Sequence, residues 1–273
     1  WARHQRRSTS LAPARWREGP SWLGRSEPEG VVVERYDVVR VWGSQGEGAG
    51  QLQSPFGVAV DCAGFVYVAD TSNHRIVKFT AVGDHVDTWG HFSPSDHDDW
   101  DDGFDTPVGI AADRRGSVYI ADCLNARIQE WTSDGVFVGS WGRVGRHRGP
   151  LFPPAGVAVD PAGNVFVSDG GDGLVQVFDG STHRCQSIWG GWSDELTDGR
   201  FYRRVGYRGI AVDADGQKFD SRGVFVTEWG RHGTAPGEFN DPIGVAVAET
   251  GWVYVTNASN HRVQVFTPAL APG

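Results

Sequence analysis

Residues 55–79 read Pro-Phe-Gly-Val-Ala-Val-Asp-Cys-Ala-Gly-Phe-Val-Tyr-Val-Ala-Asp-Thr-Ser-Asn-His-Arg-Ile-Val-Lys-Phe, and this stretch decides the fold. It holds three short runs of β-branched and aromatic residues, separated by residues that favour turns. The first run, residues 57–60, is apolar throughout and predicts a buried inner strand. The Asp-x-x-Gly sequence that follows predicts a turn, because aspartate can bond the backbone and glycine supplies a positive φ. The stretch therefore predicts three successive strands.

The same pattern returns along the chain and shows that the protein is built from repeats. Further copies start at Pro107, Pro154, Arg208 and Pro242. Trp-Gly pairs, which predict a fourth strand in each unit, recur about every 40 to 50 residues. They begin at Trp42, Trp89, Trp141, Trp189 and Trp229. Four short strands in a repeat of this length predict an all-β fold, a β-propeller with one blade per repeat.

Two repeats depart from the pattern. The last repeat stops at Pro268 without its fourth strand, whereas residues 36–43, Tyr-Asp-Val-Val-Arg-Val-Trp-Gly, form such a strand at the other end of the chain. We therefore predict that this N-terminal strand closes the last blade, which removes an open sheet edge. The fourth repeat is truncated, because a single residue separates Gly216 from Lys218 where the first repeat has a long segment.

Composition and charge define the broad class of the chain. Residues 1–30 are rich in Arg, Pro, Ser and Gly without a strand or helix period, which predicts a disordered tail before a propeller at residues 31–268. The composition is that of a soluble globular protein, and no apolar run is long enough to span a membrane. The net charge of −9 argues against a general nucleic-acid binder. The residues point to no particular cellular compartment.

The units resemble the NHL repeat family, whose Asn-His-Leu signature is recognisable here at three places: Asn73-His74-Arg75, Asn125-Ala126-Arg127 and Asn260-His261-Arg262. The resemblance covers residues 36–267 and implies an NHL-type propeller. Propellers of this family usually have six blades, and five repeats are recognisable here, so we expect five or six. The third repeat departs from the signature, with Asp172-Gly173-Leu174 in its place. The family includes partner-binding and RNA-binding domains, extracytoplasmic sensors and peptide-amidating lyases, so the resemblance implies a fold more narrowly than a function.

Catalytic chemistry is not favoured by the residues. In the lyases of this family, metal-binding histidines stand just before the inner strand, and none of the matching positions here is histidine: Phe56, Val108, Ala155, Arg208 and Ile243. We therefore predict no cofactor and no catalytic residue. Acidic and basic residues that recur in the blades are expected to hold the structure together rather than to react. These are Asp70, Asp122 and Asp169, with Arg75, Arg127 and Arg262.

The most acidic segment, residues 96–105, offers a weak metal candidate. A calcium loop here would use Asp98 and Asp102 as ligands, because carboxylate oxygens suit that ion. However, Trp100 stands where an EF-hand needs an oxygen ligand, and no glutamate closes the loop. A solvated loop between blades is the simpler interpretation.

Basic residues gather in the loops before the third and fourth inner strands. Because equivalent loops share one face of a propeller, these residues should form a basic arc beside the acidic segment, suited to a charged partner. We predict that a protein or peptide binds at Arg143, Arg146, Arg148, Arg203, Arg204 and Arg208. Two alternatives stay open: RNA, bound by the arc with Tyr202 or Tyr207, and a metal-dependent lyase or hydrolase with an atypical site in the central channel.

Overall fold

A computed structural model describes most of the propeller region predicted from the sequence. The described residues are 36–94, 102–142, 151–169, 174–190, 192–193, 201–202, 231–248, 250 and 252–268. The predicted tail, residues 1–30, and the truncated repeat that starts at Arg208 lie outside them.

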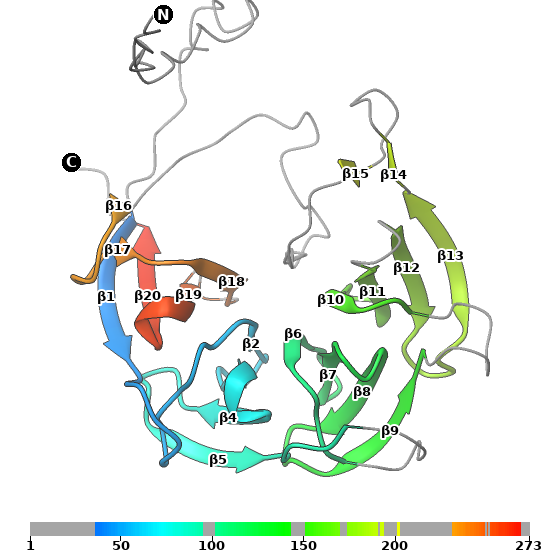
Figure 1. Cartoon of the computed structure of the whole chain (residues 1–273), viewed down its shortest axis with the longest axis horizontal. Helices are drawn as coiled ribbons and strands as arrows, with labels where there is room; N and C mark the ends of the chain where they lie inside the picture. Colours follow the sequence, from blue (N-terminus) through cyan, green and yellow to red (C-terminus); the bar gives the residue numbers. More distant parts are fainter. Residues whose placement is uncertain are drawn as a thin grey trace, which may run out of the picture. The chain divides into compact units, whose positions relative to one another are not determined.

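The described residues form four sheets of four antiparallel strands each (Figure 1), together with two short two-stranded parallel pairs. The first blade consists of β2 (Val58–Val60), β3 (Val66–Asp70), β4 (Arg75–Phe79) and β5 (His85–Trp89). The second consists of β6 (Pro107–Ala112), β7 (Ser117–Asp122), β8 (Arg127–Thr132) and β9 (Phe137–Trp141). The third consists of β10 (Pro154–Val159), β11 (Asn164–Asp169), β12 (Leu174–Asp179) and β13 (Cys185–Gly190). The strands predicted for the first repeat are confirmed.

The fourth sheet, the C-terminal blade, combines strands from both ends of the described chain. Its strands are β18 (Pro242–Val247), β19 (Val253–Asn257), β20 (Arg262–Pro268) and β1 (Tyr36–Trp42). β1 pairs antiparallel with β20, in a register that runs from Tyr36 opposite Pro268 to Trp42 opposite Val263. The N-terminal strand is therefore the outermost strand of this sheet.

The blades follow one another around a common centre in the order C-terminal, first, second and third (Figure 1), with β18, β2, β6 and β10 innermost. The glycine of each Gly-Val-Ala-Val type inner strand explains how closely they pack. A Cβ added to Gly57 would overlap the carbonyl oxygen of Val108 in the second blade. A Cβ added to Gly109 would likewise overlap the carbonyl oxygen of Ala155 in the third blade. One added to Gly244 would overlap the carbonyl oxygen of Phe56, just before β2 of the first blade. A side chain at these positions would therefore push neighbouring blades apart.

The hydrophobic core lies between blades rather than within one. One cluster joins Tyr67 and Ile76 of the first blade to Ile120 and Trp131 of the second. Equivalent clusters join the second blade to the third and the C-terminal blade to the first. The Trp-Gly tryptophans contribute to these interfaces, since Trp89 packs beneath the turn at Gly135 in the next blade. A blade therefore depends on its neighbour for burial of its apolar surface.

The meander of each blade separates the connections into two faces. The turns after the innermost and third strands define the turn face: residues 61–65, 80–84, 113–116, 133–136, 160–163 and 180–184. The predicted Asp-x-x-Gly turns are confirmed there: the Asp61 carboxylate accepts hydrogen bonds from the Ala63 and Phe65 amides, and Gly64 has a φ of 86°. The crossovers, which lead from one blade to the next inner strand, lie at the opposite ends of the strands.

Candidate functional site: the crossover face

The crossover face consists of the crossovers and of the turns that bear the Asn-x-Arg signature. Its described crossover residues are 43–57, 90–94, 102–106, 142, 151–153 and 231–241, and its signature turns are residues 71–74, 123–126 and 258–261. Two of these turns contain short 3-10 helices, η2 (Thr71–Asn73) and η3 (Ala258–Asn260).

Three crossovers close in the same way. A buried apolar residue near the end of each loop donates its backbone N–H to a carbonyl near the beginning. The bonds run from Leu52 to Ser44 at 2.8 Å, from Phe104 to His91 at 2.7 Å and from Leu151 to Gly142 at 2.8 Å. The buried residue anchors the end of the loop on the core, and its hydrogen bond connects this end to the beginning of the loop.

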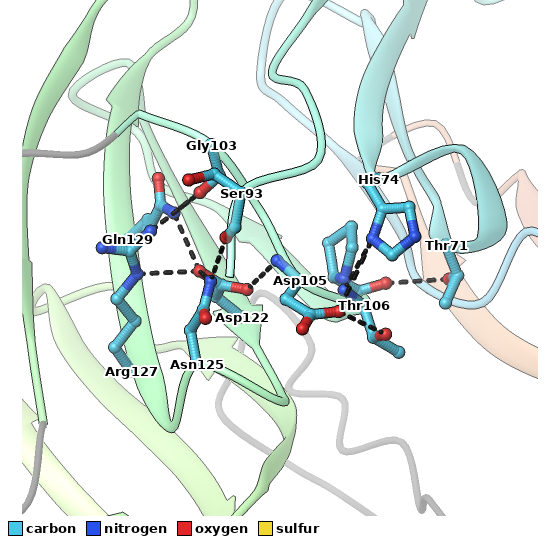
Figure 2. Close-up of polar contacts among 11 residues, drawn as sticks. Thr71, His74, Ser93, Gly103, Asp105, Thr106, Asp122, Asn125, Arg127 and Gln129 are labelled. Carbon is cyan, nitrogen blue, oxygen red and sulfur yellow. Dashed lines mark hydrogen bonds and ion pairs between the residues drawn. The ribbon is translucent and has the colours of Figure 1, made fainter. Parts of the chain in front are cut away.

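A buried polar network holds the crossover of the second blade (Figure 2). The Asp122 carboxylate, which is fully buried, accepts hydrogen bonds from Arg127 Nε at 2.7 Å and from Asn125 Nδ2 at 2.8 Å. Its other oxygen accepts the backbone N–H of Asp105 at 2.7 Å. Arg127 also donates to the carbonyl of Gly103, so blade and crossover are joined on both sides of the carboxylate.

Related networks hold the crossovers of the first and C-terminal blades, and in the C-terminal blade the aspartate is replaced. Asp70 binds Arg75 Nε at 2.7 Å and the backbone N–H of Gln53 at 2.6 Å. In the C-terminal blade Asn257 replaces the aspartate, and its amide accepts from Asn240 and donates to the Glu238 carbonyl. The structural role predicted for the recurring aspartates and arginines is confirmed in these blades, because their charged groups are engaged inside the fold.

The electrostatics of the network support the same conclusion. Burial raises the pKa of Asp122 above that of an ordinary aspartate, and the charge of Arg127 and the amide donors oppose this shift. Burial likewise raises the pKa of Asp70, against the hydrogen bonds from Gln53 and Arg75. The Asp122 carboxylate accepts hydrogen bonds from four donors, the fourth being Gln129 Nε2 at 3.0 Å, so it is a structural group and not a free acid or base.

The signature histidines connect adjacent blades. His74 Nδ1 accepts the backbone N–H of Thr106 at 3.1 Å, and His261 Nδ1 accepts that of Ser54 at 3.0 Å. Both histidines are half-buried and pack between blades. Within the described part of the chain, no group of three or more His, Cys, Asp and Glu side chains is suited to hold a metal ion.

All six arginines of the predicted binding arc lie outside the described residues. Arg143, Arg146 and Arg148 belong to residues 143–150, between the hydrogen-bonded pair Gly142 and Leu151. Arg203, Arg204 and Arg208 follow the short strand β15 (Phe201–Tyr202), and Asp98 belongs to residues 95–101; these are also outside. The remaining metal candidate, Asp102, is described and exposed on the crossover to the second blade.

Sequence reasoning missed three exposed apolar side chains on this face. They are Phe92 at 57% exposure, Leu124 at 59% and Phe152 at 44%. Phe92 packs edge-on against the His74 ring, with centroids 4.6 Å apart. An aromatic residue in a loop between polar neighbours was the available signal, but exposure at such a position depends on the fold.

The comparison with known families identifies the repeats. A family model named NHL repeat matches residues 52–79, 154–178 and 239–266, which lie in the first, third and C-terminal blades. The chain carries NHL repeats. The second blade lies outside these matches, yet it has the same strand order as the matched blades, and its pair of Asp122 and Arg127 corresponds to Asp70 and Arg75 of the first blade.

Several known proteins are similar to part of this chain. Human NHL repeat-containing protein 3 is 28% identical over 131 residues, which cover 45% of this chain and 38% of that protein. Mouse NHL-repeat-containing protein 4 is 28% identical over 114 residues, which cover 38% of this chain and 76% of that protein. Human E3 ubiquitin-protein ligase TRIM32 is 29% identical over 134 residues, covering 46% and 19%. The chain thus spans about two fifths of the first of these relatives.

Proposed function

We propose that this chain is a non-catalytic interaction scaffold, which binds a protein or peptide partner on the crossover face. The observation that carries the proposal is that the residues which recur in every blade hold the crossovers in place. The recurring Asp, Asn and Arg side chains are engaged in internal hydrogen bonds, as Asp122 and Arg127 show. The residues that differ in chemistry from blade to blade are therefore those between the two anchored ends of a crossover, which we call the loop tip.

The tips of neighbouring crossovers differ in charge and in apolar character. Residues 143–150 include Arg143, Arg146 and Arg148, whereas residues 95–102 of the preceding crossover include several aspartates. Exposed Phe92 and the other two apolar side chains add surface that a partner would bury. These properties favour a peptide with acidic groups beside apolar side chains. Arginine is well suited to such a partner, because its guanidinium pairs with carboxylates in two-point geometry.

Ligase activity is not carried over from the relatives named as E3 ubiquitin-protein ligases. The similarity to TRIM32 covers 19% of that protein, and the similarity to mouse TRIM71 covers 5% of it. What this chain shares with them is the repeat, so a binding role for the repeat region is the part of the comparison that the proposal uses.

The proposal is tested by selecting peptides from a random display library on the immobilised chain. The affinity of a selected peptide is then measured for the wild type and for Arg146→Ala/Arg148→Ala. The matched control is Arg114→Ala/Arg184→Ala, which removes the same charge from exposed positions on the turn face. We expect loss of binding in the first variant and retention in the control. Equal affinity for all three proteins would overturn the assignment to the crossover face.

RNA is an outcome of the same experiment. Single-stranded homopolymeric RNA is titrated against the same three proteins at two salt concentrations. If the arc binds RNA, affinity falls steeply with salt and is lost in Arg146→Ala/Arg148→Ala. Such a result, without any selected peptide, would replace the peptide proposal.

We also propose that the ring contains five or six blades and is closed through β1. Short parallel pairings within four of the described crossovers support more than four blades, because each such crossover should lead into a blade. Gln45 pairs with Leu52 and Phe92 with Phe104 in the described crossovers. The same parallel pairing joins β14 (Trp192–Ser193) to β15, and β16 (Arg231–His232) to β17 (Glu238–Phe239). Five such crossovers, counting the one that closes at Leu151, correspond to five blades.

A further inference from the structure

The structure describes three successive joins between blades, and they differ in one contact. In two of them a signature histidine accepts a backbone N–H from the residue just before the proline of the next blade. These are His261 with Ser54, which joins the C-terminal blade to the first, and His74 with Thr106, which joins the first to the second. At the third join, the equivalent positions are Ala126 and Pro153. Proline has no N–H, so this join has neither donor nor histidine.

The backbone on both sides of the bond is fixed. His74 and His261 have φ of 52° and 50°, and each donates its own N–H to the first residue of the short 3-10 helix before it. Their partners Thr106 and Ser54 also have positive φ, at 61° and 47°. Because the backbone of both residues is fixed by their turns, the bond depends on whether Nδ1 of the histidine carries a proton.

Protonation of the imidazole is incompatible with this bond. A backbone N–H donates to Nδ1 only when Nδ1 carries a lone pair, so the histidine must be neutral with its proton on Nε2. Adding a proton to Nδ1 places two N–H groups face to face and leaves the backbone N–H without its acceptor. Histidine is the side chain that ordinarily gains a proton in mild acid.

The two histidines differ in what surrounds them. His74 Nδ1 lies 3.7 Å from Asp105 Oδ1, so this carboxylate is in place to pair with a protonated Nδ1. His261 forms no ion pair with a carboxylate of the described chain. Its charged neighbour in the same turn, Arg262, directs its guanidinium to the carbonyls of Thr234 and Ala235, and the Glu238 carboxylate across the crossover accepts from the Ala235 N–H.

We propose that protonation of His261 releases the contact between the C-terminal blade and the first blade, so that this join loosens in mild acid. It is the join at which residues from opposite ends of the repeat region meet, 207 positions apart in the chain. The join through His74 also loses its Thr106 hydrogen bond on protonation, but the protonated Nδ1 then faces the Asp105 carboxylate on the next crossover, which keeps the two blades in contact. At the third join, neither Ala126 nor Pro153 can gain a proton, so the contact equivalent to the one between His261 and Ser54 has no such switch.

The test is hydrogen exchange at the Ser54 amide, at about pH 7.5 and about pH 5.5, corrected for the intrinsic pH dependence of exchange. The informative variant is His261→Asn, because asparagine tolerates positive φ and its Oδ1 occupies the same place along the side chain as Nδ1 but does not titrate. His74→Asn is the matched control. In the wild type we expect protection of the Ser54 amide to fall about fivefold on acidification, the size of one lost hydrogen bond.

The variants separate this effect from general acid destabilisation. His261→Asn should keep the Ser54 amide equally protected at both pH values, whereas His261→Ala should leave it unprotected at both. His74→Asn should behave as the wild type does at Ser54. Protection that falls equally in the wild type and in His261→Asn, or that does not fall in the wild type, would overturn the proposal.

Discussion

At the scale of single residues, the buried ion pair between Asp122 and Arg127 has the greatest energetic consequence. Arg127→Met should lower the free energy of unfolding by about 3 to 5 kcal/mol, because Asp122 is then buried without its cation or must take up a proton. Urea denaturation measures this. Arg75→Met is the control with the smaller expected cost, because the Arg75 side chain is 15% exposed whereas that of Arg127 is fully buried. A cost at Arg75 equal to that at Arg127 would contradict the argument from burial.

Another residue-scale prediction concerns Glu130 and His183, which join the second blade to the third at 2.8 Å. Burial acts to raise the pKa of Glu130, but the hydrogen bonds from His183 and Ser117 outweigh it and hold the pKa below the ordinary value. A depressed carboxyl pKa stabilises the fold above the unfolded-state pKa, and the stabilisation is lost as the pH falls through the folded-state pKa. The melting temperatures of the wild type and Glu130→Gln should therefore converge between about pH 5 and about pH 3. A constant difference would exclude this contribution.

At the scale of elements, the close approach of inner strands gives a sharp prediction. Gly109→Ala should destabilise the protein by about 1 to 3 kcal/mol, because its Cβ would overlap backbone atoms of Ala155 and Val157, which cannot move aside as a side chain can. Gly139→Ala, in the outer strand β9, is the control, since nothing lies within 4 Å of the added Cβ. Thermal unfolding of both variants measures the difference. Equal effects would show that inner strands are not so closely packed.

The pairing of β1 with β20 gives a second prediction at this scale. A chain that lacks residues 1–42 should melt at a lower temperature and self-associate, because β20 then becomes an exposed edge. A chain that lacks only residues 1–30 serves as the control and should behave as the full chain does. Calorimetry and size-exclusion chromatography provide the measurements. A monomeric, equally stable chain after the longer deletion would mean that β1 does not close the ring.

At the scale of the whole molecule, the repeat pattern made the architecture predictable from the sequence, whereas the contacts between repeats were not predictable. Alternating apolar runs and the Trp-Gly period predicted the strands and the propeller. The sequence could not show that Trp89 packs beneath Gly135, or that His261 contacts Ser54, because such partners are far apart along the chain. The arginines of the predicted arc do not recur regularly, so their chemistry suggested a binding face without placing its contacts.

Binding on the crossover face is the central claim, and hydrogen exchange of the full chain with and without a selected peptide tests it most directly. The account predicts slower exchange in residues 143–153 and around Phe92, with no change on the turn face at residues 113–116 and 180–184. Protection confined to the turn face, by a peptide that binds tightly, would contradict the account.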